Sequence, residues 1–304
     1  MNTSASQPHL LSVTATDETL LSVTRLGSPK APATLAYLHG PGADASYWTP
    51  LTSYLDRHLD GGIVQITYDQ RGHGHSGGSN VDTPLEVAQL ADDLDAVLTR
   101  ATGHVVLVTH SLASMIVHAY AERYPQRART LAAVVMFAAA AHLPESPALD
   151  QIWPHRRAAR FGRRRDTRDP LLAALYEAPR QRRFAAPLLP ERQVSALTRS
   201  QHLGAYSRYS LTRNASTILR SVPTLVISGE LDTVITPGHS RFLAELIWAD
   251  TETLTGAGHS LPYNDPARAS GPVLRGLEIA YQHASGALEA LAEVDIADAE
   301  REVG

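Results

Sequence analysis

A serine stands where a predicted buried strand runs into a predicted helix, and this junction constrains the fold more than any other feature of the chain. Residues 105–108 are apolar and mostly β-branched, and helical spacing starts at Leu112 almost without a gap. So sharp a turn points the Ser111 hydroxyl out of the sheet, at a helix N-terminus where backbone N–H groups stabilise negative charge. The crowded turn needs small residues two before and two after the serine, and Thr109 and Ala113 stand there. This segment alone leaves open the alternative interpretation that Ser111 is simply a helix N-cap, a position where serine is preferred.

A nucleophilic serine needs a histidine base and an acid that orients the base, and both residue types follow downstream. Asp232 lies just past the carboxyl end of a predicted buried strand that ends at Ile227. His259 lies in a glycine-rich loop after the next predicted strand, where glycines let the chain bend the imidazole toward a neighbouring strand end. The order Ser111, Asp232, His259 is typical of one fold among the convergent triads. Glu230 is the fallback for the acid.

Strand-like and helical segments alternate along the chain, which predicts an α/β protein with a mostly parallel central sheet flanked by helices. The expected strands are residues 10–16 and 19–25 (a hairpin), 33–38, 62–68, 105–108, 131–137, 223–227 and 251–255. The expected helices are residues 47–59, 84–100, 112–124 and 266 to about 297. Residues 143–221 are Arg- and Pro-rich and lose this alternation, so we expect an inserted helical lid there, with 1–142 and 222–304 forming the core. The short helical pieces expected in the lid are 171–177, 192–202 and 205–211.

Four motifs, together and in this order, resemble those of the α/β-hydrolase superfamily over residues 10–284. They are the oxyanion loop (His-Gly-Pro-Gly, 39–42), the Asp-x-Arg-Gly-x-Gly-x-Ser turn (69–76), the nucleophile elbow (109–113), and the acid and base loops (229–232 and 258–259). The resemblance implies an α/β-hydrolase fold in which Ser111, Asp232 and His259 form the catalytic triad.

The resemblance also implies where the oxyanion of the reaction is bound. One backbone donor is the residue after the nucleophile, Leu112. The second donor in such enzymes usually follows the His-Gly pair, but here that residue is Pro41, which has no N–H. A neighbouring amide is expected to replace it, with Gly42 the first choice and Gly40 the second. The residues expected to contact substrate are Pro41, His110, Ile235 and Trp153.

These motifs predict a lidded serine hydrolase of the carboxylesterase type (EC 3.1), which cleaves an ester, thioester, lactone or amide through an acyl-enzyme on Ser111. Two alternatives stay open. A proline-iminopeptidase-like aminopeptidase is one, because residues 40–42 resemble that group's Gly-Pro-Gly loop, although Leu112 stands where that group has tryptophan. A ligand-binding protein of the same fold without turnover is the other, because Pro41 and Thr109 depart from the usual motifs.

The composition excludes several other classes of protein. The chain has 304 residues and no cysteine, which excludes a disulfide scaffold, a thiol nucleophile and a cysteine-based metal site. His39, His73 and His75 fall in loops that the resemblance explains structurally, so we expect no metal and no cofactor. The longest uncharged apolar run, 131–143, is too short for a membrane span of about 20 residues. Residues 1–13 lack the features of a signal peptide, so we expect a cytoplasmic protein.

The formal net charge of -4 hides an uneven charge distribution. Ten arginines and three acidic residues lie between 156 and 183, whereas six acidic residues and one arginine lie in 285–304. A solvated lid surface is the simplest interpretation; a contact with the acidic tail, within or between chains, and docking of an anionic substrate are the others. No nucleic-acid motif accompanies the basic patch. We therefore expect a small-molecule ester or acyl substrate and no nucleic acid, and leave a homodimer open.

Overall fold

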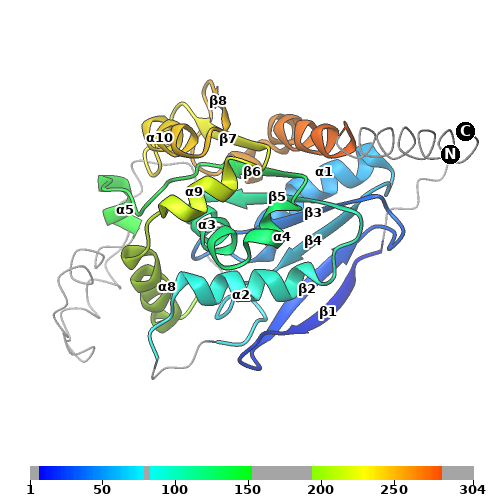
Figure 1. The fold of residues 1–304 in the computed structure, drawn as a ribbon, viewed down its shortest axis with the longest axis horizontal. Coiled ribbons are helices and arrows are strands. Elements are labelled where there is room, and N and C mark those ends of the chain that lie inside the picture. The colour runs from blue at the N-terminus through cyan, green and yellow to red at the C-terminus, as the bar shows by residue number, and fades with distance from the viewer. Residues whose placement is uncertain (1–6, 79–82, 153–193, 283–304) are drawn as a thin grey trace, which may run out of the picture.

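The computed structural model describes residues 7–78, 83–152 and 194–282, which form one eight-stranded sheet with helices on both faces (Figure 1). The strands are β1 (His9–Thr14), β2 (Leu20–Leu26), β3 (Ala33–Leu38), β4 (Val64–Tyr68), β5 (His104–His110), β6 (Ala133–Phe137), β7 (Thr224–Gly229) and β8 (Asp250–Leu254). Their order across the sheet is β1-β2-β4-β3-β5-β6-β7-β8. The β1–β2 hairpin joins β4 antiparallel, and all other neighbouring strands are parallel. The predicted mostly parallel α/β sheet is confirmed.

Alternating side chains of the central strands feed two hydrophobic cores, one on each face of the sheet. On β5, Leu107 packs into one core, whereas Val106 and Val108 pack into the other. The helices that pack on the first core are α2 (Val87–Leu98), α3 (Ser114–Arg123), α9 (Arg213–Leu219) and α10 (Pro237–Ile247). The second core lies under α1 (Thr49–Leu59) and the helix at 266–282. Burial on both faces explains why the central strands are continuous apolar runs, while the edge strand β8 alternates exposed and half-buried residues.

Several element boundaries differ from the sequence prediction. The remaining elements are two 3-10 turns, η1 (Ala45–Trp48) and η2 (Ser111–Ala113), and the helices α4 (Pro125–Arg129), α5 (Pro147–Ile152), α8 (Ala196–Arg208) and α11 (Leu261–Asn264). Residues 192–202 and 205–211, predicted as two helices, contribute to the single helix α8. The helix continues through Gly204 because Leu203 and Ala205 beside it are buried against the core. The sequence prediction also missed α4, α9 and α10.

The expected lid, residues 143–221, is described only at 143–152 and 194–221. Within these parts α9 packs on α3 and α4 and contributes to the first core. Trp153, the arginines of 156–183 and the predicted helix at 171–177 lie outside the described residues, as does the acidic tail. The lid boundaries therefore stay a prediction. Among the described helices, none has both the length and the apolar character needed to cross a membrane.

Candidate active site

The predicted nucleophile sits in a strained turn between β5 and α3. Ser111 has a φ of +59°, a left-handed conformation that costs a non-glycine residue about 1–3 kcal/mol. β5 ends at His110, and η2 carries the chain through Leu112 directly into α3. Thr109 and Ala113 are fully buried, so the turn accommodates both residues that stand where glycine is usual. The turn thus presents the serine side chain at the carboxyl edge of the sheet.

Three residues from distant parts of the chain form one hydrogen-bonded line. His259 Nε2 lies 3.1 Å from Ser111 Oγ, and His259 Nδ1 lies 2.8 Å from Asp232 Oδ2. An ionised carboxylate only accepts hydrogen bonds, so His259 Nδ1 carries the proton and Nε2 is left as an acceptor facing the serine hydroxyl. The Asp232 side chain is inaccessible, and the His259 side chain is 12% exposed. The structure therefore brings the three predicted residues together, with the base between the buried acid and the serine.

Backbone amides fix the direction of the acid. Oδ1 of Asp232 accepts the N–H groups of Val234 and Ile235 at 2.8 and 3.0 Å. Both carboxylate oxygens therefore have partners, as a buried carboxylate requires. Glu230, the alternative acid, instead accepts the Gly256 N–H at 2.8 Å. Glu230 thus binds the backbone of the base loop, whereas Asp232 binds the base itself.

The acid loop after β7 and the base loop after β8 are held directly against each other. Leu231 donates its N–H to the Ala257 carbonyl oxygen at 2.8 Å. A Cβ atom built on Gly229 would come within 2.5 Å of the same oxygen. Only glycine permits this close approach of two backbones. The contact explains how a carboxylate and an imidazole carried by different loops come within hydrogen-bond distance.

The loop after β3 backs onto the nucleophile. A Cβ atom on Gly40 would lie 3.2 Å from Ser111 Cβ and 3.1 Å from His110 Nδ1, so Gly40 is in close contact with this turn. Gly42, with a φ of +81°, donates its N–H to His73 Nε2 at 3.2 Å. The sequence prediction ranked Gly42 above Gly40 as the second oxyanion donor. The structure engages the Gly42 amide with a histidine and places Gly40 beside the serine, and the choice of donor stays a prediction.

Two buried histidines support this loop. His39 Nδ1 faces the Gly40 carbonyl oxygen at 2.9 Å, and its Nε2 accepts a backbone N–H of the loop after β4 at 3.0 Å. His73 Nδ1 faces the Arg71 carbonyl oxygen at 3.1 Å. A ring nitrogen that faces a carbonyl must donate, so both imidazoles are neutral with the proton on Nδ1. Burial lowers the pKa of His39 to about 4 and the pKa of His73 to about 3.

A third histidine, from α8 of the expected lid, contacts His73 and the loop after β4. His202 of α8 donates from Nε2 to the Arg71 carbonyl oxygen at 3.0 Å, and its ring meets His73 edge-on at 4.6 Å. Sequence reasoning missed His202, because nothing in its helical segment marks a residue that contacts a distant loop. Among the described residues there is no group of three His, Asp or Glu side chains that could hold a metal ion. The histidines of this cluster therefore act as neutral hydrogen-bonding groups.

Asp69 and Arg71 tie the loop after β4 to its neighbours. Asp69 accepts the Ala45 N–H at 2.8 Å and a second backbone N–H within its own loop. Arg71 is fully buried and donates to Asp93 on α2 and to Asp17 in the β1–β2 turn. Asp69 and Arg71 thus organise the loop after β4 through these hydrogen bonds and ion pairs.

The residues expected to contact substrate have varied surroundings. Pro41 is partly exposed beside the site. His110 is only 1% exposed, and its Nε2 donates to the His259 carbonyl oxygen at 2.8 Å. Ile235 is fully buried. Both side chains are buried next to residues of the hydrogen-bonded line, Trp153 lies outside the described residues, and the substrate contacts stay a prediction.

Tyr47 belongs to the same surroundings, and sequence reasoning gave it no role. Its ring stacks on His110 at 4.6 Å and on Tyr263 at 5.9 Å. The available signal was the aromatic pair Tyr47 and Trp48, which follows directly on the oxyanion loop. These rings form an apolar support behind the nucleophile turn.

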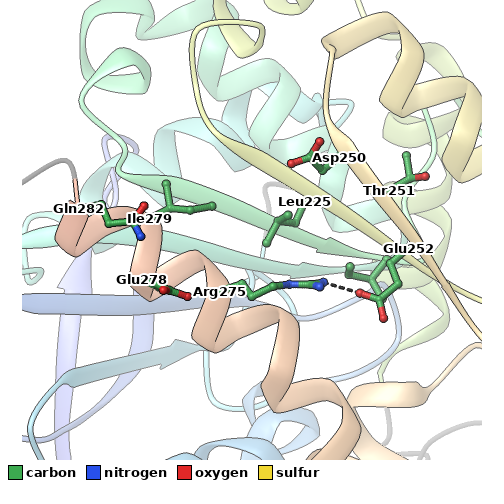
Figure 2. A pocket seen from close by; sticks show the side chains of 9 residues that line it. Leu225, Asp250, Thr251, Glu252, Arg275, Glu278, Ile279 and Gln282 are labelled. Atoms are coloured by element: carbon green, nitrogen blue, oxygen red, sulfur yellow. Dashed lines mark hydrogen bonds and ion pairs between the residues drawn. The ribbon is translucent and has the colours of Figure 1, made fainter.

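A separate open cavity of about 580 Å³ lies beside β7, β8 and the helix at 266–282 (Figure 2). It is lined by Leu225, Ile227, Asp250, Thr251, Glu252, Arg275, Glu278, Ile279 and Gln282. The lining includes no residue of the hydrogen-bonded line formed by Ser111, His259 and Asp232. Arg275 reaches across the cavity to pair with Glu252. The cavity is thus a different place from the candidate active site.

The parallel sheet with a serine at its central strand–helix turn defines the class of α/β hydrolases. Residues 35–270 match the model of the Alpha/beta hydrolase family, and the chain belongs to this family. The fold and the class predicted from the sequence motifs are confirmed.

Several known proteins of similar sequence or fold are hydrolases. The chain is 32% identical over 101 residues to 2-(acetamidomethylene)succinate hydrolase from Mesorhizobium japonicum, a match that covers 33% of this chain and 34% of that protein. The structure of a carboxylesterase from Nitrososphaera gargenis is similar with a TM-score of 0.66 and 19% identity, covering 90% of this chain and all of that one. The enol-lactonase from Burkholderia xenovorans has a TM-score of 0.63 and 21% identity, covering 88% and 100%. Similarity at this level of identity shows the shared fold.

Proposed function

We propose that this protein is a serine hydrolase that cleaves a carboxylic ester through an acyl-enzyme on Ser111. The observation that carries the proposal is the line of hydrogen bonds from Ser111 Oγ through His259 to Asp232, with distances of 3.1 and 2.8 Å. A hydroxyl nucleophile, a neutral base and a buried acid in this order are the groups that acyl transfer requires. The fold shared with a carboxylesterase and a lactonase supports the same class of reaction.

Each group has one role in the proposed mechanism. Ser111 Oγ attacks the ester carbonyl carbon while His259 Nε2 takes its proton, and His259 then delivers that proton to the leaving alkoxide. Asp232 keeps the imidazole in the Nδ1–H tautomer and stabilises the imidazolium that forms. Water next attacks the acyl-enzyme with His259 again as the base, which releases the carboxylic acid and restores Ser111. The proposed reaction uses no cofactor.

The tetrahedral intermediate needs backbone donors for its oxyanion. We assign the first to the Leu112 N–H, which follows the nucleophile where η2 enters α3. For the second we place Gly40 ahead of Gly42, because Gly40 lies against Ser111 and the Gly42 amide already donates to a histidine. Pro41 has no N–H to offer. Loss of one donor costs about 10²–10³ in kcat, so the second donor decides how fast this hydrolase is.

The same chemistry cleaves lactones, thioesters and amides, and these are the nearest alternatives to the ester. The relative named 2-(acetamidomethylene)succinate hydrolase and the enol-lactonase are reasons to include the amide and the lactone among test substrates. A prolyl p-nitroanilide tests the proline-iminopeptidase-like reading. Faster turnover of any of these than of p-nitrophenyl butyrate would replace the ester as the preferred substrate.

The nucleophile is tested by labelling with a fluorophosphonate and by hydrolysis of short-chain p-nitrophenyl esters. Wild-type protein should be labelled and should hydrolyse the esters, and Ser111→Ala should lose both properties. Ser114→Ala is the matched control, because Ser114 is a buried serine three residues later that donates to the Ala140 carbonyl, and it should behave as wild type. Wild-type protein that resists the probe and leaves the esters intact would instead support a binding protein without turnover.

A further inference from the structure

His110 connects the nucleophile turn to the loop that carries the base. It is the last residue of β5, directly before Ser111, and its ring is 1% exposed. Its Nε2 lies 2.8 Å from the backbone carbonyl oxygen of His259, although 149 positions separate the two residues in the chain. The two imidazole rings lie 4.7 Å apart between centroids, tilted by 54°. The side chain of His110 therefore makes a direct bond between the two parts of the site that must stay in register.

The ring of His110 has one protonation state and one orientation. A carbonyl oxygen only accepts, so Nε2 carries a proton. Burial keeps Nδ1 without one, so the ring is neutral. Burial holds the pKa of His110 well below its ordinary value, and the neighbouring His259 lowers it further. The ring also stacks on Tyr47 at 4.6 Å, with 24° between the planes. The stack and the buried surroundings aim the Nε2–H at the base loop.

Two glycines of the base loop stand on either side of the buried Ala257. Cβ atoms built on Gly256 and Gly258 would meet no atom within 4 Å, so both glycines border open space. Between them, the Ala257 carbonyl accepts a bond from the acid loop. Beyond Gly258, the His259 carbonyl accepts the bond from His110. Hydrogen bonds on either side of Gly258, together with the buried Ala257 side chain, thus hold the backbone that presents the imidazole.

We propose that His110 is a positioning residue, whose Nε2–H fixes the His259 backbone so that the base stays within reach of Ser111 Oγ. The inference rests on the proposed function, because it concerns the base of that reaction. It replaces the substrate contact that the sequence predicted for His110. A displacement of about 1 Å in a reacting group costs about 10²-fold in rate. The loss of this bond acts on kcat and leaves KM unchanged, because a buried ring behind the nucleophile does not touch the substrate.

The test compares His110→Phe with His110→Gln on p-nitrophenyl butyrate. Phenylalanine keeps a flat ring against Tyr47 but has no donor, whereas the glutamine Nε2 lies as many bonds from Cβ as the imidazole Nε2 and can donate. We expect His110→Phe to lower kcat by about 10- to 100-fold with KM within about twofold of wild type, and His110→Gln to recover most of the loss. His118→Phe is the control, because His118 is a fully buried histidine of α3 outside the site, and it should keep the wild-type kcat.

Thermal unfolding of the same variants separates positioning from loss of structure. His110→Phe and His118→Phe should lower Tm by similar amounts, while only His110→Phe loses kcat. His110→Leu gives the same comparison where the phenyl ring is not accommodated. The inference is overturned if the variant without a donor keeps the wild-type kcat, or if glutamine recovers none of the loss. Wild-type protein without any hydrolysis overturns the proposed function itself, and that result is obtained before the variants are compared.

Discussion

Two buried carboxylates of this protein are equally hidden from solvent and have very different partners. Asp232 is 3% exposed and accepts hydrogen bonds from backbone amides and from His259. Asp93 is 1% exposed and accepts two bonds from the guanidinium of Arg71. An imidazole can take up a proton on its far nitrogen, whereas a guanidinium stays charged and offers only donors. Burial of a carboxylate therefore does not by itself mark a catalytic acid; the partner does.

What lies beyond each partner separates the two regions further. Beyond His259 is the hydroxyl of Ser111. Beyond Arg71 is a second carboxylate, Asp17, at 2.7 Å in the turn between β1 and β2. The first line ends in a group that can react, and the second fastens the N-terminal hairpin to the loop after β4 and to α2. The first arrangement suits chemistry and the second suits stability, so mutations in the two should affect different measurements.

The largest effect is expected from removal of the acid at the candidate site. Asp232→Asn should lower kcat by about 10⁴-fold, because an amide no longer enforces the Nδ1–H tautomer of His259 or stabilises its cation. Glu230→Gln is the matched control, since the Glu230 carboxylate binds the backbone of Gly256, and kcat should stay within about threefold of wild type. Steady-state kinetics on one p-nitrophenyl ester measures both variants. A loss in kcat below about tenfold for Asp232→Asn would show that Asp232, like Asp93, does not act as the catalytic acid.

The second effect concerns the free energy of unfolding. Arg71→Met leaves Asp93 buried without its charged partner, and breaking such a pair costs about 3–5 kcal/mol. Urea denaturation should show this loss, while kcat per folded molecule stays near the wild-type value. The double variant Arg71→Met with Asp93→Leu should regain part of the stability, because the carboxylate that still lacks its arginine, Asp17, is partly exposed and not buried. A fall in kcat without a fall in stability would place Arg71 in the chemistry instead.

The third effect is the pH dependence of the free energy of unfolding, which reports on buried neutral histidines outside the two regions compared above. Burial lowers the pKa of His39 to about 4 and the pKa values of His73 and His118 to about 3, against 6.5 for an ordinary histidine. Above pH 6.5 these groups are neutral in both states and have no effect. Below it the unfolded chain binds protons first, so the free energy of unfolding falls with pH down to the folded-state pKa.

The loss should amount to about 2 kcal/mol per histidine between pH 6.5 and pH 5. Urea denaturation at a series of pH values measures it. His118→Phe removes one such group outside the site and should flatten the dependence by about the same amount. An equal slope for His118→Phe and wild type would mean that His118 binds its proton as readily in the folded state as in the unfolded chain.

Short local patterns were enough to predict the candidate site. A strand, a serine and a helix in close succession define the turn at Ser111, and parallel strands bring their carboxyl ends to one edge of the sheet. For this reason Asp232 and His259 were expected beside Ser111, and the structure places them there. The sheet was predictable on the same grounds, because burial on both faces leaves long apolar runs in the sequence.

Contacts that depend on three-dimensional packing were not predictable in this way. The sequence around a histidine before the serine is the same whether its side chain faces substrate or donates to the backbone of another loop. His110 donates to the backbone of His259. The bond from Gly42 to His73 was equally hidden, because it joins two loops 31 residues apart. The sequence predicted two helical pieces, 192–202 and 205–211, whereas burial of Leu203 and Ala205 against the core accompanies one continuous helix.

The smallest effect on stability is expected from a variant of a third carboxylate, Glu252. Like Asp93 it is paired with an arginine, but unlike Asp93 it is partly exposed. Glu252 pairs with Arg275 across the open cavity, with the two side chains 37% and 50% exposed (Figure 2). Water competes for both charges there, so Glu252→Gln should lower the free energy of unfolding by only about 0.2–1 kcal/mol and leave kcat unchanged. The effect should fade in 1 M NaCl, because salt screens exposed charges. Urea denaturation with and without salt measures both expectations. A loss near that of Arg71→Met would show that an arginine–carboxylate pair in this fold stabilises to the same extent wherever it lies, and that burial is not what separates the regions.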